Sequence, residues 1–376
     1  MSSCFNPWLA VGGCPSQVSG VFGAYAQAVA IGQAQQRIVR LCESVGDARD
    51  LRLSLLEEIR LAVDFDSYAF VLTDPETSVG VAPLAAIPFM HELPNLIRLK
   101  YLTEINRWTT LTEPPVALLQ QATGGDPTKS LVWRDLLGRN GVVDVASSVF
   151  RDRHGCWGFL DLWRTGAAEK FGESEAAFLA DINQPVTRAL RQSQASTFVA
   201  RPTGARRLGP LVLLLSPDLK VLGQTPETHE YLRVLVPPAP DRPPIPASAY
   251  NVAAQLLAVE AGVDPNPASA RVHLSDGLWL TLRAARIGEG EARGPRDIAV
   301  TIEETAPAER VDLFARAFAF SARETEMLGH LVTGIDTREI ARQMFLSEHT
   351  VQDHLKSIFA KTAMRSRREL LSHALG

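Results

Sequence analysis

The sequence is poor in cysteine and lacks the long apolar runs that membrane-spanning helices need. It has four cysteines in 376 residues, and none of them forms a CxxC pair: Cys4, Cys14, Cys42 and Cys156. This excludes a disulfide framework and favours reduced thiols. No apolar stretch approaches the roughly 20 residues that span a bilayer. No charged residue precedes Arg37, so the basic start of a secretory signal is missing, and we expect a cytoplasmic protein.

The sequence also lacks the signatures of common enzyme classes. It contains no GxSxG, HExxH or GxxxxGK[ST] motif, which argues against a serine hydrolase, a zinc protease and a P-loop nucleotidase. His349 and His354 have no third ligand nearby in the sequence, so they do not predict a metal site. We therefore expect no enzyme activity, no catalytic residue, no metal and no cofactor.

Neither sign of charge dominates the chain. The 38 Lys and Arg residues oppose 42 Asp and Glu residues, which gives a net charge of −4. This excludes a histone-like protein that coats nucleic acid through bulk charge, but it leaves room for a local basic surface. Because 46% of the residues are hydrophobic and 21% are charged, the chain can bury large cores. Its length predicts two or three domains.

Three changes in composition divide the chain. A polar stretch rich in helix breakers lies at 201–207, and a run with six prolines in ten residues lies at 237–246. From Pro307 onward the pattern is helical to the end. The proline run is either a domain linker or a long loop within a domain. We predict an N-terminal extension and three domains, over residues 1–32, 33–200, 208–306 and 312–376.

The sequence pattern of the first of these domains predicts helices, then strands, then a helix. Residues 68–73 form an apolar run typical of a buried strand. The β-rich runs 142–151 and 157–164 flank a turn at 152–155 and predict a hairpin. Residues 173–194 predict one long amphipathic helix.

The second domain predicts a different order of elements, with a strand pair, two helices and then three strands. The alternation of polar and apolar residues in the later runs is typical of half-buried strands. The predicted ranges, in chain order, are 211–216, 220–223, 227–235, 248–261, 270–274, 278–287 and 297–303.

Both β-rich domains resemble sensory families. The segment HGCWGFLDLWR at 154–164, followed by FGESE at 171–175, resembles the last strands and helix of a GAF domain. The order of elements at 209–305, with DGLWL at 276–280, is similar to a PAS domain. The resemblance implies a GAF-like α/β sensor and a PAS-like α+β module, which respond to a small molecule or a protein signal and often dimerise. Either block could instead be only a structural spacer.

The C-terminal segment carries the densest helix signals. Ser321 and Glu324 have the spacing of a capping box, in which each side chain bonds the other residue's amide. Gly334 stands where a helix end takes up a left-handed residue. Asp336 and Ser347 are placed to cap a second and a third helix.

The third of these helices, expected over 348–361, has two distinct faces. A recognition helix needs this division, because one side packs while the other meets base edges in a major groove about 12 Å wide. The apolar stripe comprises Val351, Leu355, Ile358 and Phe359, and the polar row comprises His349, Gln352, Asp353, Lys356 and Ala360. Between 349 and 368, five cations face a single acid, so this part can contact phosphates.

This pattern resembles the LuxR-type helix-turn-helix family. The resemblance covers about 316–376 and rests on FSARE at 320–324, EIA at 339–341, LSE at 346–348, TV at 350–351 and IFAK at 358–361. It implies an all-α four-helix domain that binds double-stranded DNA as a homodimer, so the expected fold class is multidomain α+β.

The resemblance also assigns roles to residues. It implies base contacts from Gln352, Asp353 and Lys356. It implies DNA-backbone contacts from Thr337, Ser347, Thr350, Lys361, Arg365 and Arg367. It implies dimerisation through Leu370, Leu371, Ala374 and Leu375.

The sequence departs from the family pattern at two places. Thr362-Ala363 stands where relatives usually carry Leu-Gly, so the turn before the last helix is altered. Asp353 lies on the groove face, where many relatives carry a neutral or basic residue. Asp353 either accepts a hydrogen bond from cytosine N4 or weakens non-specific phosphate binding.

Sensor modules ahead of a DNA reader predict a transcriptional regulator with a small-molecule effector and no membrane partner. In an alternative, the front modules bind a protein partner, for which the proline run is suited, and DNA binding is secondary. A response regulator needs a phospho-acceptor Asp among alternating strands and helices. The clustered strands argue against it, and Asp74 is followed by Pro75 without an acidic pair upstream.

Four tryptophans either line an effector pocket or pack the core: Trp108, Trp133, Trp157 and Trp163.

Overall fold

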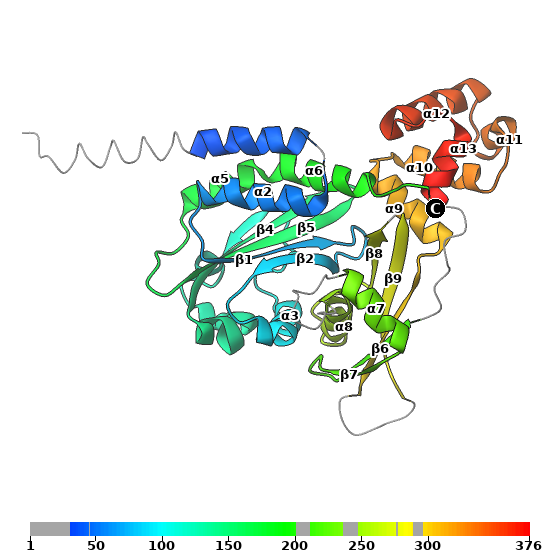
Figure 1. The fold of residues 1–376 in the computed structure, drawn as a ribbon. Helices are drawn as coiled ribbons and strands as arrows, with labels where there is room; N and C mark the ends of the chain where they lie inside the picture. Colours follow the sequence, from blue (N-terminus) through cyan, green and yellow to red (C-terminus); the bar gives the residue numbers. More distant parts are fainter. Residues whose placement is uncertain (1–30, 45, 201–210, 236–246, 276, 289–295) are drawn as a thin grey trace, which may run out of the picture.

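The protein consists of two five-stranded antiparallel sheets followed by a helical C-terminal region, as seen in a computed structural model (Figure 1). The structure describes residues 31–44, 46–200, 211–235, 247–275, 277–288 and 296–376. The mixed α+β class expected from the sequence is confirmed. Every strand pair in these ranges is antiparallel, which is unlike the parallel sheet of a receiver domain.

The first sheet has the strand order β2-β1-β5-β4-β3. The hairpin predicted around the turn at 152–155 is confirmed as β4 and β5. The sequence reasoning missed the two edge strands, β2 and β3. The elements of this part are a helix over 31–43, α2 (Ala48–Arg60), β1 (Ser67–Thr73), β2 (Gly80–Ala86), α3 (Leu93–Leu102), β3 (Val116–Leu118), α4 (Leu119–Ala122), β4 (Val142–Asp152), β5 (Gly155–Thr165), α5 (Glu173–Asp181) and α6 (Asn183–Ala195).

The two faces of the first sheet bury different side chains. Along β5, Leu160 and Leu162 join the core that contains α2 and α6, whereas Phe159 and Trp163 belong to the cores on the side of α3. This alternation is the period of two expected for a strand buried on both faces. Figure 1 shows the same layers, with α2 and α6 above the sheet and α3 below it.

The single long helix predicted over 173–194 is wrong, because the chain forms two helices that break at Ile182. Pro185 explains the break. A continuous helix would need an amide at position 185 to bond the carbonyl of Asp181, and proline has none. In α6 the proline instead lies in the first turn, where the missing amide has no partner to lose.

The second sheet has the order β7-β6-β10-β9-β8 and confirms the predicted sequence of strands and helices. The proline run at 237–246 lies outside the described residues. The elements are β6 (Leu211–Leu215), β7 (Val221–Gln224), α7 (Pro226–Leu235), α8 (Ala247–Glu260), β8 (Ser269–Ser275), β9 (Leu278–Arg286) and β10 (Ile298–Glu304).

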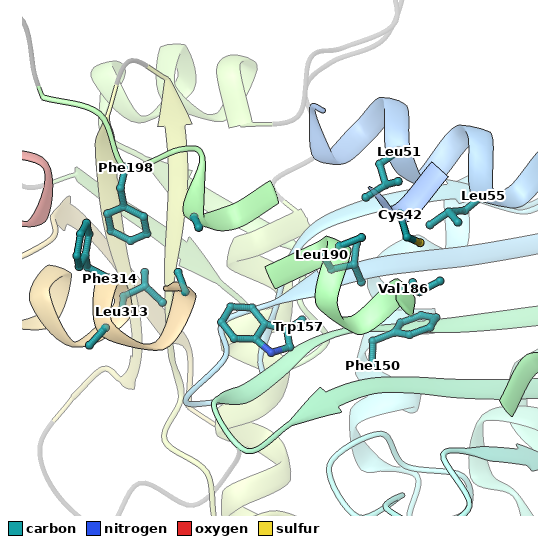
Figure 2. Packing of buried hydrophobic residues seen from close by; sticks show 14 of the residues in the cluster. Cys42, Leu51, Leu55, Phe150, Trp157, Val186, Leu190, Phe198, Leu313 and Phe314 are labelled. Atoms are coloured by element: carbon teal, nitrogen blue, oxygen red, sulfur yellow. The ribbon is translucent and has the colours of Figure 1, made fainter. Parts of the chain in front are cut away.

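Five helices complete the chain, and the first of them joins the three parts together. They are α9 (Pro307–Ala317), α10 (Ala322–Val332), α11 (Thr337–Gln343), α12 (Glu348–Thr362) and α13 (Arg367–Leu375). Helix α9 contacts α6, α10 and α13. At the junction, the Phe198 ring stacks on Trp279 at 5.0 Å and meets Phe314 edge-on at 5.3 Å. Figure 2 shows Phe198 beside Leu313 and Phe314 of α9.

The hydrophobic cores run across the predicted domain boundaries. One cluster of buried residues includes Leu190 before the boundary near 200 and Leu331 in the C-terminal region. A second includes Val71 and Tyr101 of the first part together with Leu213 of the second. Helix α8 packs directly on α3. The three parts therefore pack against one another through apolar surface.

Two buried ion pairs reinforce the contact between the first and second parts. Arg107 Nε lies 2.9 Å from Asp264 Oδ2, and Arg271 bonds both carboxylate oxygens of Asp74 at 2.7 Å. Burial alone would raise the pKa of Asp74, but the hydrogen bonds and charge of Arg271 outweigh burial and lower that pKa. Asp74 therefore stays ionised and serves as a structural partner.

Among the helices of the described residues, none combines the length and the apolar character that crossing a bilayer requires.

Candidate nucleic-acid interface

The C-terminal helices begin at the capping residues that the sequence predicts. Ser321 Oγ accepts from the Glu324 amide at 3.3 Å, and the Glu324 carboxylate accepts from the Ser321 amide at 2.6 Å, so the capping box is confirmed. Asp336 caps α11, and Ser347 caps α12 by accepting from the Thr350 amide at 3.1 Å. These local bonds fix where each helix starts.

The turn between α11 and α12 is tight and has no glycine. Phe345 adopts a φ of 56°, and the amide of Leu346 donates to the carbonyl of Ala341 at 2.9 Å, which is the six-to-one bond of a Schellman ending. The Phe345 ring is 94% exposed. This turn directs α12 away from α11, which is the geometry of a helix-turn-helix.

Helix α12 presents the two faces that its sequence predicts. Val351 and Ile358 are fully buried in the C-terminal core. Gln352, Asp353 and Lys356 are all exposed and lie on the opposite side. The outward row is therefore free to meet a groove, and the inward row anchors the helix.

Asp353 interacts with a lysine and a histidine of its own face. Lys356 Nζ lies 3.0 Å from Asp353 Oδ1, and His349 Nε2 lies 3.5 Å from Asp353 Oδ2. The hydrogen bond from Lys356 lowers the pKa of the Asp353 carboxyl. To the two roles left open by the sequence, the geometry adds a third, in which Asp353 orients Lys356.

Lys361 forms an internal ion pair with α10. Its ammonium lies 2.5 Å from Glu324 Oε2 and donates to the Ala319 carbonyl at 3.1 Å. Burial opposes ionisation of Glu324, but hydrogen bonds from Lys361, the Ser321 amide and Ser357 outweigh it and lower the pKa of Glu324 to about 2. The same carboxylate thus completes the capping box and anchors α12.

Arg367 also has partners within the chain. Its Nη2 donates to the carbonyls of Leu331 and Ile335, at 3.2 and 2.7 Å. These carbonyls lie at and just beyond the C-terminus of α10, where the backbone has unpaired acceptors. In contrast, the Arg365 side chain is exposed. Of the cations expected at the DNA backbone, Arg365 remains directed to solvent, whereas Lys361 and Arg367 hold helices together.

The three hydroxyl residues expected to contact the DNA backbone lie at the starts of helices. Thr337 is the first residue of α11, Ser347 precedes α12, and Thr350 lies in its first turn. Ser347 Oγ and Thr350 Oγ1 are 2.9 Å apart. Helix α12 therefore begins with a cluster of polar groups beside its positive dipole end.

Helix α13 buries half of the residues expected to mediate dimerisation. Leu370 and Ala374 are 0% exposed and pack within the chain's own core, whereas Leu371 and Leu375 are half-buried. Helix α13 packs against α9, and Arg310 of α9 donates to the His373 carbonyl at 3.0 Å. Of these four residues, only Leu371 and Leu375 keep surface that a second chain could contact in this arrangement.

The altered turn before α13 keeps a left-handed backbone. Ala363 ends α12 with a φ of 56° and a ψ of 17°. Thr362, fully helical and buried, bonds the Ile358 carbonyl at 3.0 Å. The chain thus makes the glycine-type ending without glycine, at a conformational cost to Ala363.

A capped α10, a tight turn between α11 and α12, and a half-exposed α12 together define a helix-turn-helix domain. Residues 319–374 match the family described as bacterial regulatory proteins, luxR family. The C-terminal domain of this chain is a LuxR-family helix-turn-helix domain.

Known relatives agree with this assignment. A stretch of 52 residues is 44% identical to the CsgBAC operon transcriptional regulatory protein of Escherichia coli, covering 14% of this chain and 24% of the relative. A stretch of 132 residues is 33% identical to the "Probable HTH-type transcriptional regulator GfsR" of Streptomyces halstedii, covering 32% of this chain and 52% of the relative. The chain thus spans from about a quarter to about half of the length of these relatives.

Similarity to a solved structure extends over more of the chain but is weak. The crystal structure of Escherichia coli SdiA aligns with 90% of this chain and 94% of its own, with 12% identity and a TM-score of 0.33. A TM-score this low supports no conclusion about the arrangement of the two sheets.

Proposed function

We propose that this protein is a transcriptional regulator that reads double-stranded DNA through α12. The observation that carries the proposal is the row of exposed polar side chains on α12. This helix, with its capped start and its buried inner face, lies within the residues that match the LuxR family. Such a helix fits the major groove, where base edges display distinct donors and acceptors.

Within α12, the proposed base-reading residues are Gln352 and Lys356, with Asp353 as either a direct acceptor or the residue that orients Lys356. Arg365 and the polar start of α12 at Ser347 and Thr350 are assigned to the DNA backbone, with Thr337 beside them. Lys361 and Arg367 act mainly within the protein, because their side chains already bond α10.

The proposed roles of the other parts follow the order of the chain. Residues 33–200 and 208–306 are assigned to a GAF-like and a PAS-like module, which sense an effector or relay a signal. Residues 312–376 are assigned to the DNA reader, which binds two-fold-related half-sites as a dimer. Effector binding shifts the population between arrangements that do and do not bind DNA.

Selection from genomic fragments tests this function directly. The purified full-length protein is incubated with a genomic library at fixed salt, because affinities at different salt concentrations are not comparable. The expected result is enrichment of a two-fold-symmetric sequence. Enrichment of an asymmetric sequence would remove the dimer, and the absence of enrichment by folded protein, with and without cell extract as an effector source, would overturn the function.

A further inference from the structure

The turn between α11 and α12 carries an aromatic ring that the described part of the chain leaves uncovered. Phe345 is 94% exposed, whereas the next most exposed large hydrophobic side chain of the described residues, Leu61, is 60% exposed. Phe345 also belongs to none of the three buried clusters. Single exposed apolar residues are common in folded proteins, so the exposure of this ring indicates a site only together with a second feature.

The second feature is the backbone of Phe345. Its φ of 56° is the left-handed conformation, which is unfavourable for a bulky side chain. Leu219 has a similar φ of 61°, but its side chain is 0% exposed, so packing offsets the strain there. Phe345 has no such packing, and glycine would suit the turn better. A residue that costs stability in this way without an internal contact is expected to make an external one.

The position of the turn indicates what the ring contacts. In a helix-turn-helix, the first helix crosses the DNA backbone and the second lies in the major groove, so the turn that joins them lies at the wall of the groove. Phe345 stands two residues before Ser347 and five before Thr350. The hydroxyls of these two residues are 2.9 Å apart and are assigned to the DNA backbone above. The ring therefore lies next to groups that meet the sugar–phosphate chain.

The distance along α12 leads to the same placement. Gln352, the first of the proposed base-reading residues, lies seven residues after Phe345. At a rise of about 1.5 Å per residue this separation is roughly 10 Å, and the whole groove is about 12 Å wide. When Gln352 meets a base edge, Phe345 is therefore beyond the bases and beside the sugars.

We propose that Phe345 packs its ring against a deoxyribose at the wall of the major groove and supplies an apolar, sequence-independent part of the affinity for DNA. The C–H groups of the sugar offer apolar surface to the ring, and the contact removes both surfaces from water. A phosphate would need a charged or hydrogen-bonding group, which phenylalanine lacks. This inference rests on the proposed function and adds to it a residue and a kind of contact.

Fluorescence anisotropy of the full-length protein, with the selected duplex and a scrambled one, tests this contact. Phe345→Ala is expected to weaken binding to both duplexes about four- to tenfold per half-site, the effect of burying about half of a phenylalanine side chain. The salt slope should stay unchanged, because no cation is removed. Weakening of the selected duplex alone, or a smaller salt slope, would overturn the proposal.

Two further variants separate the ring from the backbone strain. Phe345→Gly removes the ring and relieves the left-handed φ, so it should melt at a higher temperature than Phe345→Ala and lose the same DNA affinity. Phe345→Leu keeps an apolar side chain and should bind within about threefold of the wild type. Leu61→Ala, at the exposed end of α2, is the matched control and should bind like the wild type. A loss in Phe345→Ala that Phe345→Gly does not share would come from folding and contradict the contact.

Duplexes with deoxyuridine in place of every thymidine test the thymine methyl group, which is another apolar group of the major groove. A sugar contact predicts that Phe345→Ala causes the same fold-loss with and without the methyl groups. Disappearance of the loss in the deoxyuridine duplexes would assign the ring to a base and overturn the proposal.

Failure of this inference differs from failure of the proposed function. If the wild type selects a sequence and Phe345→Ala binds it with wild-type affinity, the ring does not contact DNA and the function stands. If the folded wild type selects no DNA under any condition tested, the function is lost and the inference falls with it.

Discussion

Arg271 and Asp74 form a buried, two-pronged ion pair across the boundary between the first and second parts of the chain. Both guanidinium bonds measure 2.7 Å, the Arg271 amide donates to the same carboxylate at 2.8 Å, and Asp74 is 0% exposed. Arg271 also donates to the Glu309 carbonyl of α9 at 3.3 Å. One side chain thus connects both sheets to the helix that leads into the DNA-binding domain.

Removing the charge of Asp74 should therefore loosen the whole assembly. Asp74→Asn leaves a buried guanidinium without its counter-ion, and we expect a loss of about 3–5 kcal/mol in the free energy of unfolding. Urea unfolding measures this loss, and hydrogen exchange should locate it in β8 and α9. Glu76→Gln is the control, because Glu76 pairs with the same Arg271 but is half-exposed. A similar loss in both variants would show that burial of the pair is unimportant.

The capping box of α10 should make the stability of the DNA-binding domain depend on pH. Glu324 has its pKa lowered from 4.5 to about 2 in the folded chain. The ionised group therefore stabilises the fold above about pH 4.5, and this contribution, up to about 3 kcal/mol, is lost as the pH falls toward 2. Thermal unfolding of the wild type and Glu324→Gln should converge over this window. Glu326→Gln, at an exposed acid of the same helix, should show no such convergence.

Ala363→Gly should stabilise the protein. Ala363 holds a left-handed conformation that disfavours any side chain by about 1–2 kcal/mol, and glycine avoids most of that penalty. We expect a net gain of about 1 kcal/mol in thermal or urea unfolding. Ala360→Gly, at an exposed position inside the same helix, should instead lose about 1 kcal/mol. The same sign in both variants would contradict the conformational explanation.

The two proposed classes of DNA contact should respond differently to mutation. Lys356→Ala should weaken binding at the selected sequence by about 1–3 kcal/mol and relax the preference for one base pair. Arg365→Ala should weaken binding to all sequences alike and reduce the salt slope by about one. Fluorescence anisotropy with selected and scrambled duplexes measures both effects. Lys220→Ala, at an exposed lysine in the turn between β6 and β7, is the control. Wild-type affinity in Lys356→Ala would refute its contact with a base.

Arg367→Ala should lower the melting temperature of the protein and leave the salt slope of DNA binding nearly unchanged. Its guanidinium bonds two carbonyls at the end of α10, and charged hydrogen bonds of this kind contribute about 1.5–3 kcal/mol. The melting temperature should therefore drop in Arg367→Ala. It should stay near the wild-type value in Arg368→Ala, because Arg368 is exposed. If Arg367→Ala melts like the wild type but loses one unit of salt slope, Arg367 is a phosphate contact after all.

The sequence by itself determined the features that depend on near neighbours. Ser321, Asp336 and Ser347 cap helices because their side chains reach amides three residues ahead, and the two faces of α12 follow from a period of 3.6. The β4–β5 hairpin was readable for the same reason, since its turn and its strands are adjacent in the chain. The break before Pro185 was equally local, and the apolar periodicity of the flanking helices concealed it.

Only the tertiary structure decided which of those side chains remain available. Lys361 pairs with a glutamate 37 positions away, and Arg271 pairs with an aspartate 197 positions away. Leu370 and Ala374 lost their exposed surface when α13 packed against α9. Trp163 became buried because α3 covers its face of the sheet. These outcomes depend on how segments far apart in the sequence pack together. Local hydrophobic patterns and helix caps do not determine that packing.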